Sequence, residues 1–249
     1  MEMRAKALGW RGFRGSERRA AAFLLTIIVC AFVVTGAAHA GSSFLGSPVG
    51  LQNLTNGQSL VVGDKVFSDF FISGDISANQ VTVTPIEDSF GYGISFSGGF
   101  VAVGLGDETE DMVLGYTVAV VTNSPNLISD VHLRFNGSSV GLGSGGWGLA
   151  SVTEQVFGAN LALVDQMAVF AFSSANQTTN QLENTLLINP PRPKLVIRKD
   201  VLLRASGGFA TISIIDQTFS QIPEPSTLGL VSLGLTGLYL LLRRFRTRR

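Results

Sequence analysis

The strongest constraint on the fold is an alternation of apolar and polar residues with a period of two. Its longest run has apolar residues at Met112, Leu114, Tyr116, Val118 and Val120. Successive side chains of a β-strand point to opposite faces, so this spacing predicts a strand with one buried face. Helical spacing of three and four residues is not convincing in any window of 12 residues between the termini. We therefore expect an all-β domain.

Further segments of the same kind precede and follow this run, at 81–85, 90–96, 131–135, 150–157, 167–172, 195–197 and 209–215. Breaks rich in Gly, Asp, Asn and Pro separate them by roughly 8 to 15 residues. Asn136-Gly137 is the strongest hairpin signal, because both residues tolerate a positive φ angle. Just before it, His132 and Arg134 should face outward. We expect a β-sandwich of about 8 to 11 strands, with a jelly roll among the topologies that the pattern allows.

The segment from Asn189 to Lys194 contains three prolines and two basic residues. It could serve as a protein-recognition strand of polyproline type. The preferred interpretation is a stiff connection that crosses from one sheet of the sandwich to the other.

The last 28 residues consist of three parts in a fixed order. The first is the motif at 222–226, Ile-Pro-Glu-Pro-Ser, and the second is an uncharged 16-residue run at 227–242. A helix of that length measures roughly 24 Å against a hydrocarbon core of about 30 Å, so it spans a bilayer only with thinning or with flanking side chains that reach the interface. The third part is a basic tail that favours the cytoplasmic side, with Arg243, Arg244, Arg246, Arg248 and Arg249.

These three parts together resemble the PEP-CTERM sorting signal of Gram-negative bacteria, also catalogued as the ice-binding protein C-terminal motif. The resemblance implies recognition by an exosortase, a membrane-embedded cysteine protease or transpeptidase that cuts near the Pro-Glu-Pro. Its residues map onto Pro223, Glu224 and Pro225. In this family the cargo often accompanies exopolysaccharide production, which implies a structural or adhesive role. An ordinary C-terminal anchor after a proline-bounded linker is the alternative.

The two prolines suit such a cut site for physical reasons. They fix two φ angles and bias Ile222 and Glu224 toward extended geometry. We expect an accessible, strand-like substrate, with Glu224 as its charged handle.

The amino terminus has the order of a secretory signal peptide. Six basic residues precede Ala20, an apolar run extends to Thr35, and Ala38-His39-Ala40 is an A-x-A site. We expect export through the Sec translocon and cleavage by signal peptidase after Ala40. An uncleaved signal anchor is the alternative. The domains are then a signal peptide at 1–40, an exported domain at 41–221 and the sorting signal at 222–249.

The exported part is acidic. Of 18 basic and 18 acidic residues, six basic and two acidic precede Gly41, and five basic and one acidic follow Gln221, which leaves 7 basic and 15 acidic. This balance argues against a nucleic-acid partner, which needs clustered Lys and Arg. Cys30 is the only cysteine and lies in the signal peptide, so the exported domain has no thiol or disulfide. No cofactor is expected.

Two segments are candidates for binding. The first is a carboxylate cluster next to glycines, which could bind Ca²⁺ or form a solvated turn between strands: Asp107, Glu108, Glu110 and Asp111. The second is the glycine-rich stretch 140–148 around Trp147. Its indole could stack on a sugar ring or fold back onto the sandwich.

Catalysis has little support. After removal of the signal peptide His132 is the only histidine, and we expect it on the surface. Histidine-zinc sites and cysteine nucleophiles are excluded or nearly so, and no G-x-S-x-G motif occurs. We therefore expect a non-enzymatic protein, held briefly in the inner membrane and then left in the envelope or outside the cell. The alternative is a glycan-binding or glycan-cleaving secreted domain, with exopolysaccharide as a partner.

Overall fold

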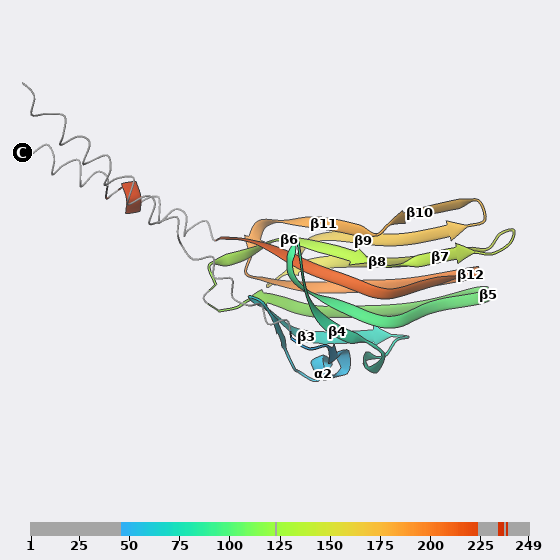
Figure 1. Ribbon diagram of the computed structural model, residues 1–249, viewed down its shortest axis with the longest axis horizontal. Helices are drawn as coiled ribbons and strands as arrows, with labels where there is room; N and C mark the ends of the chain where they lie inside the picture. The colour runs from blue at the N-terminus through green and yellow to red at the C-terminus, as the bar shows by residue number, and fades with distance from the viewer. Residues whose placement is uncertain (1–45, 123, 224–233, 237, 239–249) are drawn as a thin grey trace, which may run out of the picture. The chain divides into compact units, whose positions relative to one another are not determined.

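A computed structural model describes residues 46–122, 124–223, 234–236 and 238. Strands dominate, and every strand pairing is antiparallel (Figure 1). In chain order the elements are β1 (Val49–Gly50), α2 (Leu51–Thr55), β2 (Leu60–Val62), β3 (Lys65–Gly74), the 3-10 turn η1 (Ala78–Gln80), β4 (Thr82–Asp88), β5 (Gly91–Val120), β6 (Asn126–Phe135), β7 (Ser138–Gly141), β8 (Trp147–Gly158), β9 (Leu163–Ser174), β10 (Gln177–Gln181), β11 (Glu183–Arg192) and β12 (Lys194–Pro223). The all-β prediction is confirmed, although the 12 strands exceed the 8 to 11 expected.

One hydrogen-bonded sheet contains all 12 strands, and two strands of 30 residues, β5 and β12, run through it side by side (Figure 1). The first half of β12 has β8 on its other side, and the second half has β7 and β6. Likewise, β5 pairs with β4 through its first half and with β3 through its second half. We call the half with β2, β3, β8, β9 and β10 layer 1, and the half with β1, β4, β6 and β11 layer 2.

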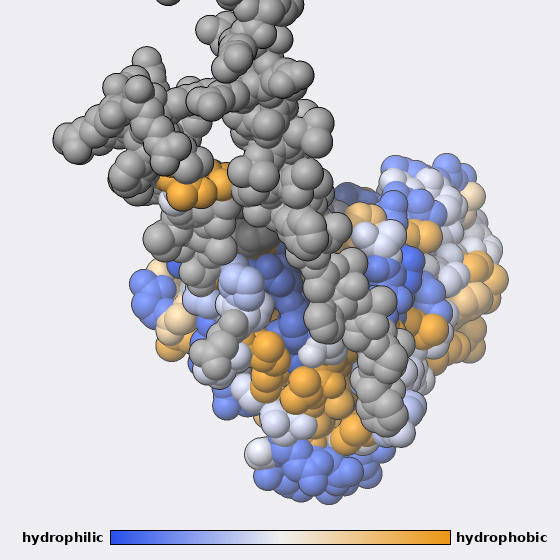
Figure 2. Space-filling view, turned by 60° about the vertical axis from the view of Figure 1, so that its left-hand side comes forward, coloured by the Kyte–Doolittle hydropathy of each residue, from blue (hydrophilic) through white to orange (hydrophobic). Residues whose placement is uncertain are grey.

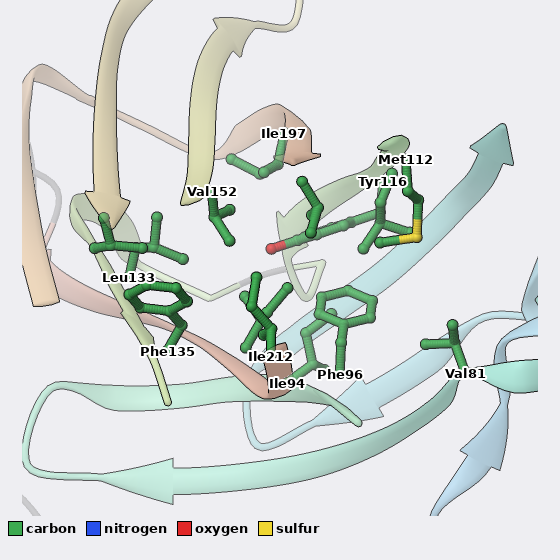
Figure 3. Close-up of a cluster of buried hydrophobic side chains, with 14 of the residues drawn as sticks. Val81, Ile94, Phe96, Met112, Tyr116, Leu133, Phe135, Val152, Ile197 and Ile212 are labelled. Atoms are coloured by element: carbon green, nitrogen blue, oxygen red, sulfur yellow. The ribbon is translucent and has the colours of Figure 1, made fainter. Parts of the chain in front are cut away.

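The two layers face each other, because aromatic rings of opposite layers are in contact. The ring centroid of Phe67 in layer 1 lies 5.9 Å from that of Phe219 in layer 2. The rings of Tyr116 in layer 1 and Phe96 in layer 2 are 5.8 Å apart. Figure 3 shows this cluster of buried side chains, with the Tyr116 hydroxyl pointing toward its middle. The arrangement is consistent with the predicted β-sandwich.

The predicted apolar stripe of β5 lies in this interior. Met112 and Tyr116 are each 1% exposed, and Leu114 and Val118 are 0% exposed. Of the intervening residues, Val113 and Ala119 are half-buried and Gly115 and Thr117 are buried as well, while Val120 at the end of the stripe is half-buried. The period of two therefore identified the buried face of this strand correctly.

The bend between the layers falls at two irregularities in the β5–β12 pairing, between Ser206 and Gly208 and between Ile212 and Ile214. Such irregularities bend and twist a strand without ending it. Gly207 has a φ of 58°, in the left-handed region that favours glycine. β12 thereby turns from one layer into the other while it stays paired with β5.

The acidic segment 107–111 was expected to be a turn or loop between strands, and this is wrong. It lies in the middle of β5, where Asp107 pairs with Ser206 and Asp111 with Leu202. Nearby glycines and charged residues favour a turn by local chemistry. The distant partner β12 instead provides uninterrupted pairing that keeps this segment extended.

The hairpin predicted at Asn136-Gly137 is also wrong. The strands on its two sides, β6 and β7, continue in one direction and both pair with β12. Asn136 lies between the two strands and is held to β12, because its Oδ1 accepts hydrogen bonds from the backbone N–H groups of Ser213 at 3.0 Å and Ile214 at 2.8 Å. A side-chain amide here replaces a backbone acceptor, which is the same property that makes Asn common in turns.

The proline-rich segment 189–194 crosses between layers as expected, since β11 pairs with β6 in layer 2 and β12 begins beside β8 in layer 1. Among the described residues no helix has the length and apolar character needed to cross a membrane. Of the predicted membrane helix at 227–242, only residues 234–236 and 238 are described, and they are helical. The predicted signal peptide, with Ala38 and Ala40, lies outside the described residues.

Candidate functional site

The predicted sorting motif begins within the last strand of the sheet. β12 runs to Pro223, and its last three residues pair with residues 126–128 of β6. Asn126 Nδ2 donates a hydrogen bond of 3.2 Å to Gln221 Oε1. The folded sheet therefore reaches the first proline of the motif without an intervening linker. Residues 224–225 and the five arginines of the tail lie outside the described residues.

Trp147, the first residue of β8, borders a hollow on the outside of layer 1. Its indole is half-buried, so it neither stands free in solvent nor packs into the sandwich interior. The guanidinium carbon of Arg204 lies 5.6 Å from the ring centroid, a cation–π distance. The hollow has a volume of about 460 Å³ and is lined by Gly145, Gly146, Trp147, Phe172, Ser174, Ala175 and Asn176.

A second, polar hollow lies further along the same side of β8. It has a volume of about 320 Å³ and is lined by Thr153, Gln155, Arg198 and Asp200. Residues of a strand separated by even numbers share a face, so Trp147 points to the same side as the first two of these. We call the surface formed by residues 147, 149, 151, 153 and 155, with their neighbours on β9 and β12, the outer β8 face. It has an aromatic end and a polar end.

Hydrophobicity alone does not single out this face. Apolar side chains are exposed elsewhere, including Val103 at 65%, Leu105 at 100% and Leu187 at 77%. Figure 2 shows hydrophobic residues in patches among hydrophilic ones on another view of the surface. Scattered exposed apolar residues are normal in folded proteins. The outer β8 face is distinguished by aromatic and polar groups on one surface.

The candidate Ca²⁺ ligands do not form a preformed site. Alternate residues of β5 point to opposite faces, which separates the four carboxylates of 107–111. No group of three or more His, Cys, Asp or Glu side chains in the described ranges is arranged to hold a metal ion. The pKa of Asp200 is raised, first by desolvation and then by the charge of Asp111 and a hydrogen bond with it. Ca²⁺ binding stays a prediction.

His132 is not on the surface as expected, because residues of neighbouring segments cover it. It is 4% exposed, its ring stacks on Phe90 with centroids 3.8 Å apart, and its Nδ1 lies 2.7 Å from Thr185 Oγ1. Its Nε2 has no hydrogen-bond partner among the described residues. Arg134, two residues on, is exposed as predicted and pairs with Asp216 at 2.9 Å. The histidine therefore has a packing role in layer 2.

Three polar residues that sequence analysis missed meet between the layers. Lys199, Glu154 and Gln217 are each 0% exposed. Lys199 Nζ contacts Glu154 Oε2 and Gln217 Oε1. Gln217 Nε2 donates a hydrogen bond of 3.1 Å to the backbone oxygen of His132. We call these three side chains the interior triad.

Burial shifts both ionisable members of the interior triad toward their neutral forms. Desolvation lowers the pKa of the Lys199 amine, against the attraction of Glu154. Desolvation also raises the pKa of the Glu154 carboxyl, against the effect of Lys199 and of a hydrogen bond with Gln217. The physical cause is the high cost of placing a charge in a medium of low polarity. Tyr116 is close enough that the charge of Glu154 adds to the desolvation that raises its pKa.

The sequence did contain a signal for the interior triad. Lys199 lies between Ile197 and Val201, and Glu154 lies between Val152 and Val156. Both therefore occupy inward positions of an alternating stripe. A charged residue at an inward position is rarely left unpaired, so each should have been assigned a buried partner.

Comparisons with solved structures give only weak similarity. The enzymatically active domain of tailspike protein 4 of Bacteriophage CBA120 is 17% identical, with 62% of this chain and 20% of that chain covered and a TM-score of 0.22. A glycosylation associate protein complex (Gap123) from Streptococcus agalactiae is 12% identical, with coverage of 60% and 44% and a TM-score of 0.24. Carbohydrate-binding modules from the β-sandwich superfamily are 12% identical, with coverage of 75% and 64% and a TM-score of 0.24.

In each of these three cases the chain spans less than two thirds of the matched structure, and TM-scores this low carry no argument about function. No match is found among curated proteins. The PEP-CTERM protein-sorting motif, in contrast, matches residues 221–246. This match extends from the end of β12 through the Pro-Glu-Pro and the apolar run into the basic tail, and it implies export and processing by an exosortase. The chain thus carries a PEP-CTERM protein-sorting motif, which begins within the last strand of a β-sheet domain.

Proposed function

We propose that this protein is a non-enzymatic β-sandwich that is exported by the Sec route and held in the inner membrane by its C-terminal helix. An exosortase then cuts it near Pro223, Glu224 and Pro225, and the domain stays in the Gram-negative envelope or extracellular matrix in a structural or adhesive role. The observation that carries the proposal is the sorting motif at 221–246, which continues directly from β12.

The join between domain and motif limits how the cut is made. Gln221 and Ile222 pair with β6 on one side, whereas the pairing of β12 with β5 ends at Phe219, so a protease can pair with them only at the edge turned away from β6. An exosortase that binds an extended substrate would therefore engage this edge or the residues after Pro223. Glu224 is the first charged group beyond the sheet and would serve as the recognition handle.

Replacing Glu224 by Ala tests the sorting role. The wild-type chain should appear shortened in the envelope or medium, while the variant should stay at its longer form in the membrane fraction. Fractionation followed by immunoblotting and intact mass measurement separates the two forms. Glu108→Ala is the matched control, because it removes an exposed carboxylate outside the motif and should be processed like wild type. Equal processing of Glu224→Ala and wild type would refute the assigned role of Glu224.

The second candidate function is glycan binding at the outer β8 face. The observation that favours it is the half-buried indole of Trp147, which shares its hollow with Phe172 and lies on the same side of β8 as the polar hollow with Arg198 and Asp200. Aromatic faces stack on the apolar faces of sugar rings, and adjacent polar groups hydrogen-bond their hydroxyls. A surface of this kind would adhere to extracellular polysaccharide.

We propose binding without turnover at this face. Glycoside hydrolysis needs two carboxyl groups at least about 5 Å apart, with the sugar between them. Among the described residues that line the two hollows, Asp200 is the only one with a carboxyl group, so the second carboxyl group is missing there. A glycan array followed by a reducing-sugar assay distinguishes the outcomes, because release of reducing ends would overturn the non-enzymatic assignment.

Trp147→Ala should weaken glycan binding at least about tenfold, the effect of losing a stacking contact and its buried area. Leu187→Ala is the control, since it removes an exposed apolar side chain from β11 in layer 2. Equal affinity of Trp147→Ala and wild type would exclude this face as the binding site.

A further inference from the structure

The interior triad joins parts of the chain that belong to opposite layers. Lys199 comes from the first half of β12 and Glu154 from its layer 1 neighbour β8, at paired positions. Gln217 comes from the second half of β12, beyond the bend at Gly207. The amine of Lys199 therefore contacts both a carboxyl and a carboxamide in a part of the domain closed to water.

We propose that Lys199 and Gln217 become joined by an amide bond between Lys199 Nζ and Gln217 Cδ, with Glu154 transferring the protons. The bond from Gln217 Cδ to Nε2 breaks, and one molecule of ammonia leaves. No electrons are exchanged, so no oxidant or reductant is needed. The product is an intramolecular cross-link between the two layers of the sandwich.

The reaction needs an uncharged amine, because an ammonium has no lone pair to attack a carbonyl carbon. Desolvation lowers the pKa of Lys199 and raises that of Glu154, which favours a neutral amine beside a neutral acid. Lys199 Nζ contacts the carbonyl oxygen of Gln217, which places the amine next to the electrophilic carbon. The nucleophile therefore has both the position and the protonation state that acyl transfer requires.

Glu154 Oε2 contacts Lys199 Nζ, the nitrogen that attacks, and Lys199 Nζ in turn contacts the carboxamide oxygen of Gln217. As the new C–N bond forms, the neutral acid of Glu154 gives its own proton to Gln217 Nε2, and its other oxygen takes the proton that Lys199 Nζ loses. Gln217 Nε2 then leaves as ammonia, and Glu154 is again a neutral acid. The proton count is balanced across the step.

Gln217 is a better acyl donor here than Glu154. If Glu154 were the acyl donor, the triad would lose its only carboxyl group for proton transfer. In addition, the hydrogen bond from Gln217 Nε2 to the backbone oxygen of His132 orients the amide. Geometry and the division of roles both point to Gln217 as the electrophile.

The number of buried hydrogen-bond donors favours the linked product over the unlinked state. In the unlinked state a lysine amine and a carboxamide NH₂ must all find acceptors in an apolar core. Formation of the bond removes ammonia and leaves a single N–H. Fewer buried donors then need partners, and each unsatisfied one is costly.

A covalent link has a clear use in an exported domain without cysteine. Cys30 is the only cysteine of the chain and precedes the domain, so no disulfide can hold the layers together. A bond between Lys199 and Gln217 closes a loop that contains the bend at Gly207. It would restrain the unfolded chain as a disulfide does, without being sensitive to reduction.

Peptide mapping of the full-length chain, expressed and exported in a Gram-negative host, tests the proposal independently of processing at either end. After denaturation and trypsin digestion, the peptide that begins at Lys199 should be attached to the peptide that contains Gln217. Their combined mass should be lower than the sum of the two by one ammonia molecule. Unlinked peptides of unmodified mass from folded wild-type protein would overturn the proposal, as would the loss of water between Lys199 and Glu154.

Glu154→Gln tests the proton-transfer role, because it keeps the shape of the side chain and removes the acid. This variant should keep Lys199 and Gln217 as free residues. Lys65→Met is the matched control, since it removes another buried lysine and should leave the cross-link intact. Complete linkage in folded Glu154→Gln would overturn the role of Glu154. Loss of the link in Lys65→Met would overturn the assignment to Lys199.

Discussion

Lys65 and Lys199 are both buried, yet their surroundings differ in access to water. Lys65 is 1% exposed, but its partner Asp64, 3.1 Å from Nζ, is 25% exposed. Its Nζ also lies 5.3 Å from the ring centroid of Tyr92. Lys199 and Glu154 are both 0% exposed. One ion pair therefore ends at the surface, and the other is sealed between two sheets.

The difference shows what burial of a lysine requires. Near the edge, Lys65 packs its aliphatic part against the domain while Asp64 stays hydrated, so the pair can remain charged. In the interior, neither Lys199 nor Glu154 has water nearby, and the attraction between them competes with two desolvation costs. The sealed pair can avoid these costs by becoming neutral, which is the state that the proposed cross-linking step uses.

The largest expected effect is on the stability of variants that lose the acidic partner of one of the two lysines. Glu154→Ala should lower the free energy of unfolding by about 3–5 kcal/mol, because Lys199 is left buried without its partner and cannot be linked. Asp64→Ala should cost only about 1 kcal/mol or less, since water can reach that site. Urea unfolding followed by fluorescence of the two variants checks the ranking. Equal losses in both variants would contradict it.

Replacing both charged members by apolar residues should restore much of this loss. Lys199→Met combined with Glu154→Leu removes both desolvation costs and fills a similar volume. We expect the double variant to be at least about 2 kcal/mol more stable than Glu154→Ala in the same urea experiment. A double variant as unstable as the single one would show that packing, and not the unpaired charge, dominates the site.

These contrasts also show what the sequence can predict. The stripes of β4, β5, β8 and β12 were predicted because a period of two depends only on local spacing. The same local logic would place Lys199 and Glu154 on inward faces, but sequence analysis missed them, and it could not have named their partners. Those partners come from strand pairing between positions 45 residues apart and, for Gln217, from a bend that brings together positions 18 residues apart.

The errors have the same origin. The acidic segment 107–111 and Asn136-Gly137 have the local chemistry of turns, but both lie against β12, whose pairing holds them along the sheet. His132 was expected outside because its strand alternates, and Phe90 and Thr185 from other segments cover it. The sorting motif was recognised because its three parts are ordered along the chain and need no tertiary contact.

The smallest expected effect is a pH dependence that separates the two lysines. Desolvation lowers the pKa of Lys65 below its usual 10.5. Between the lowered value and 10.5 the unfolded chain therefore binds more protons than the folded one, so stability should rise with pH in this window. Lys65→Met should lack this rise when urea unfolding is repeated from neutral pH to about pH 10, below the titration of ordinary tyrosines.

This measurement also examines Lys199. A free Lys199 amine with a lowered pKa would add a rise of the same sign in the part of this pH range where Glu154 is already deprotonated, and that rise would persist in Lys65→Met. An acylated Lys199 does not titrate, so the Lys65→Met profile should then lose its lysine-dependent rise. A persistent rise in Lys65→Met that disappears when Lys199→Met is added would show that the sealed amine is free, and that burial alone, without a covalent bond, keeps it neutral.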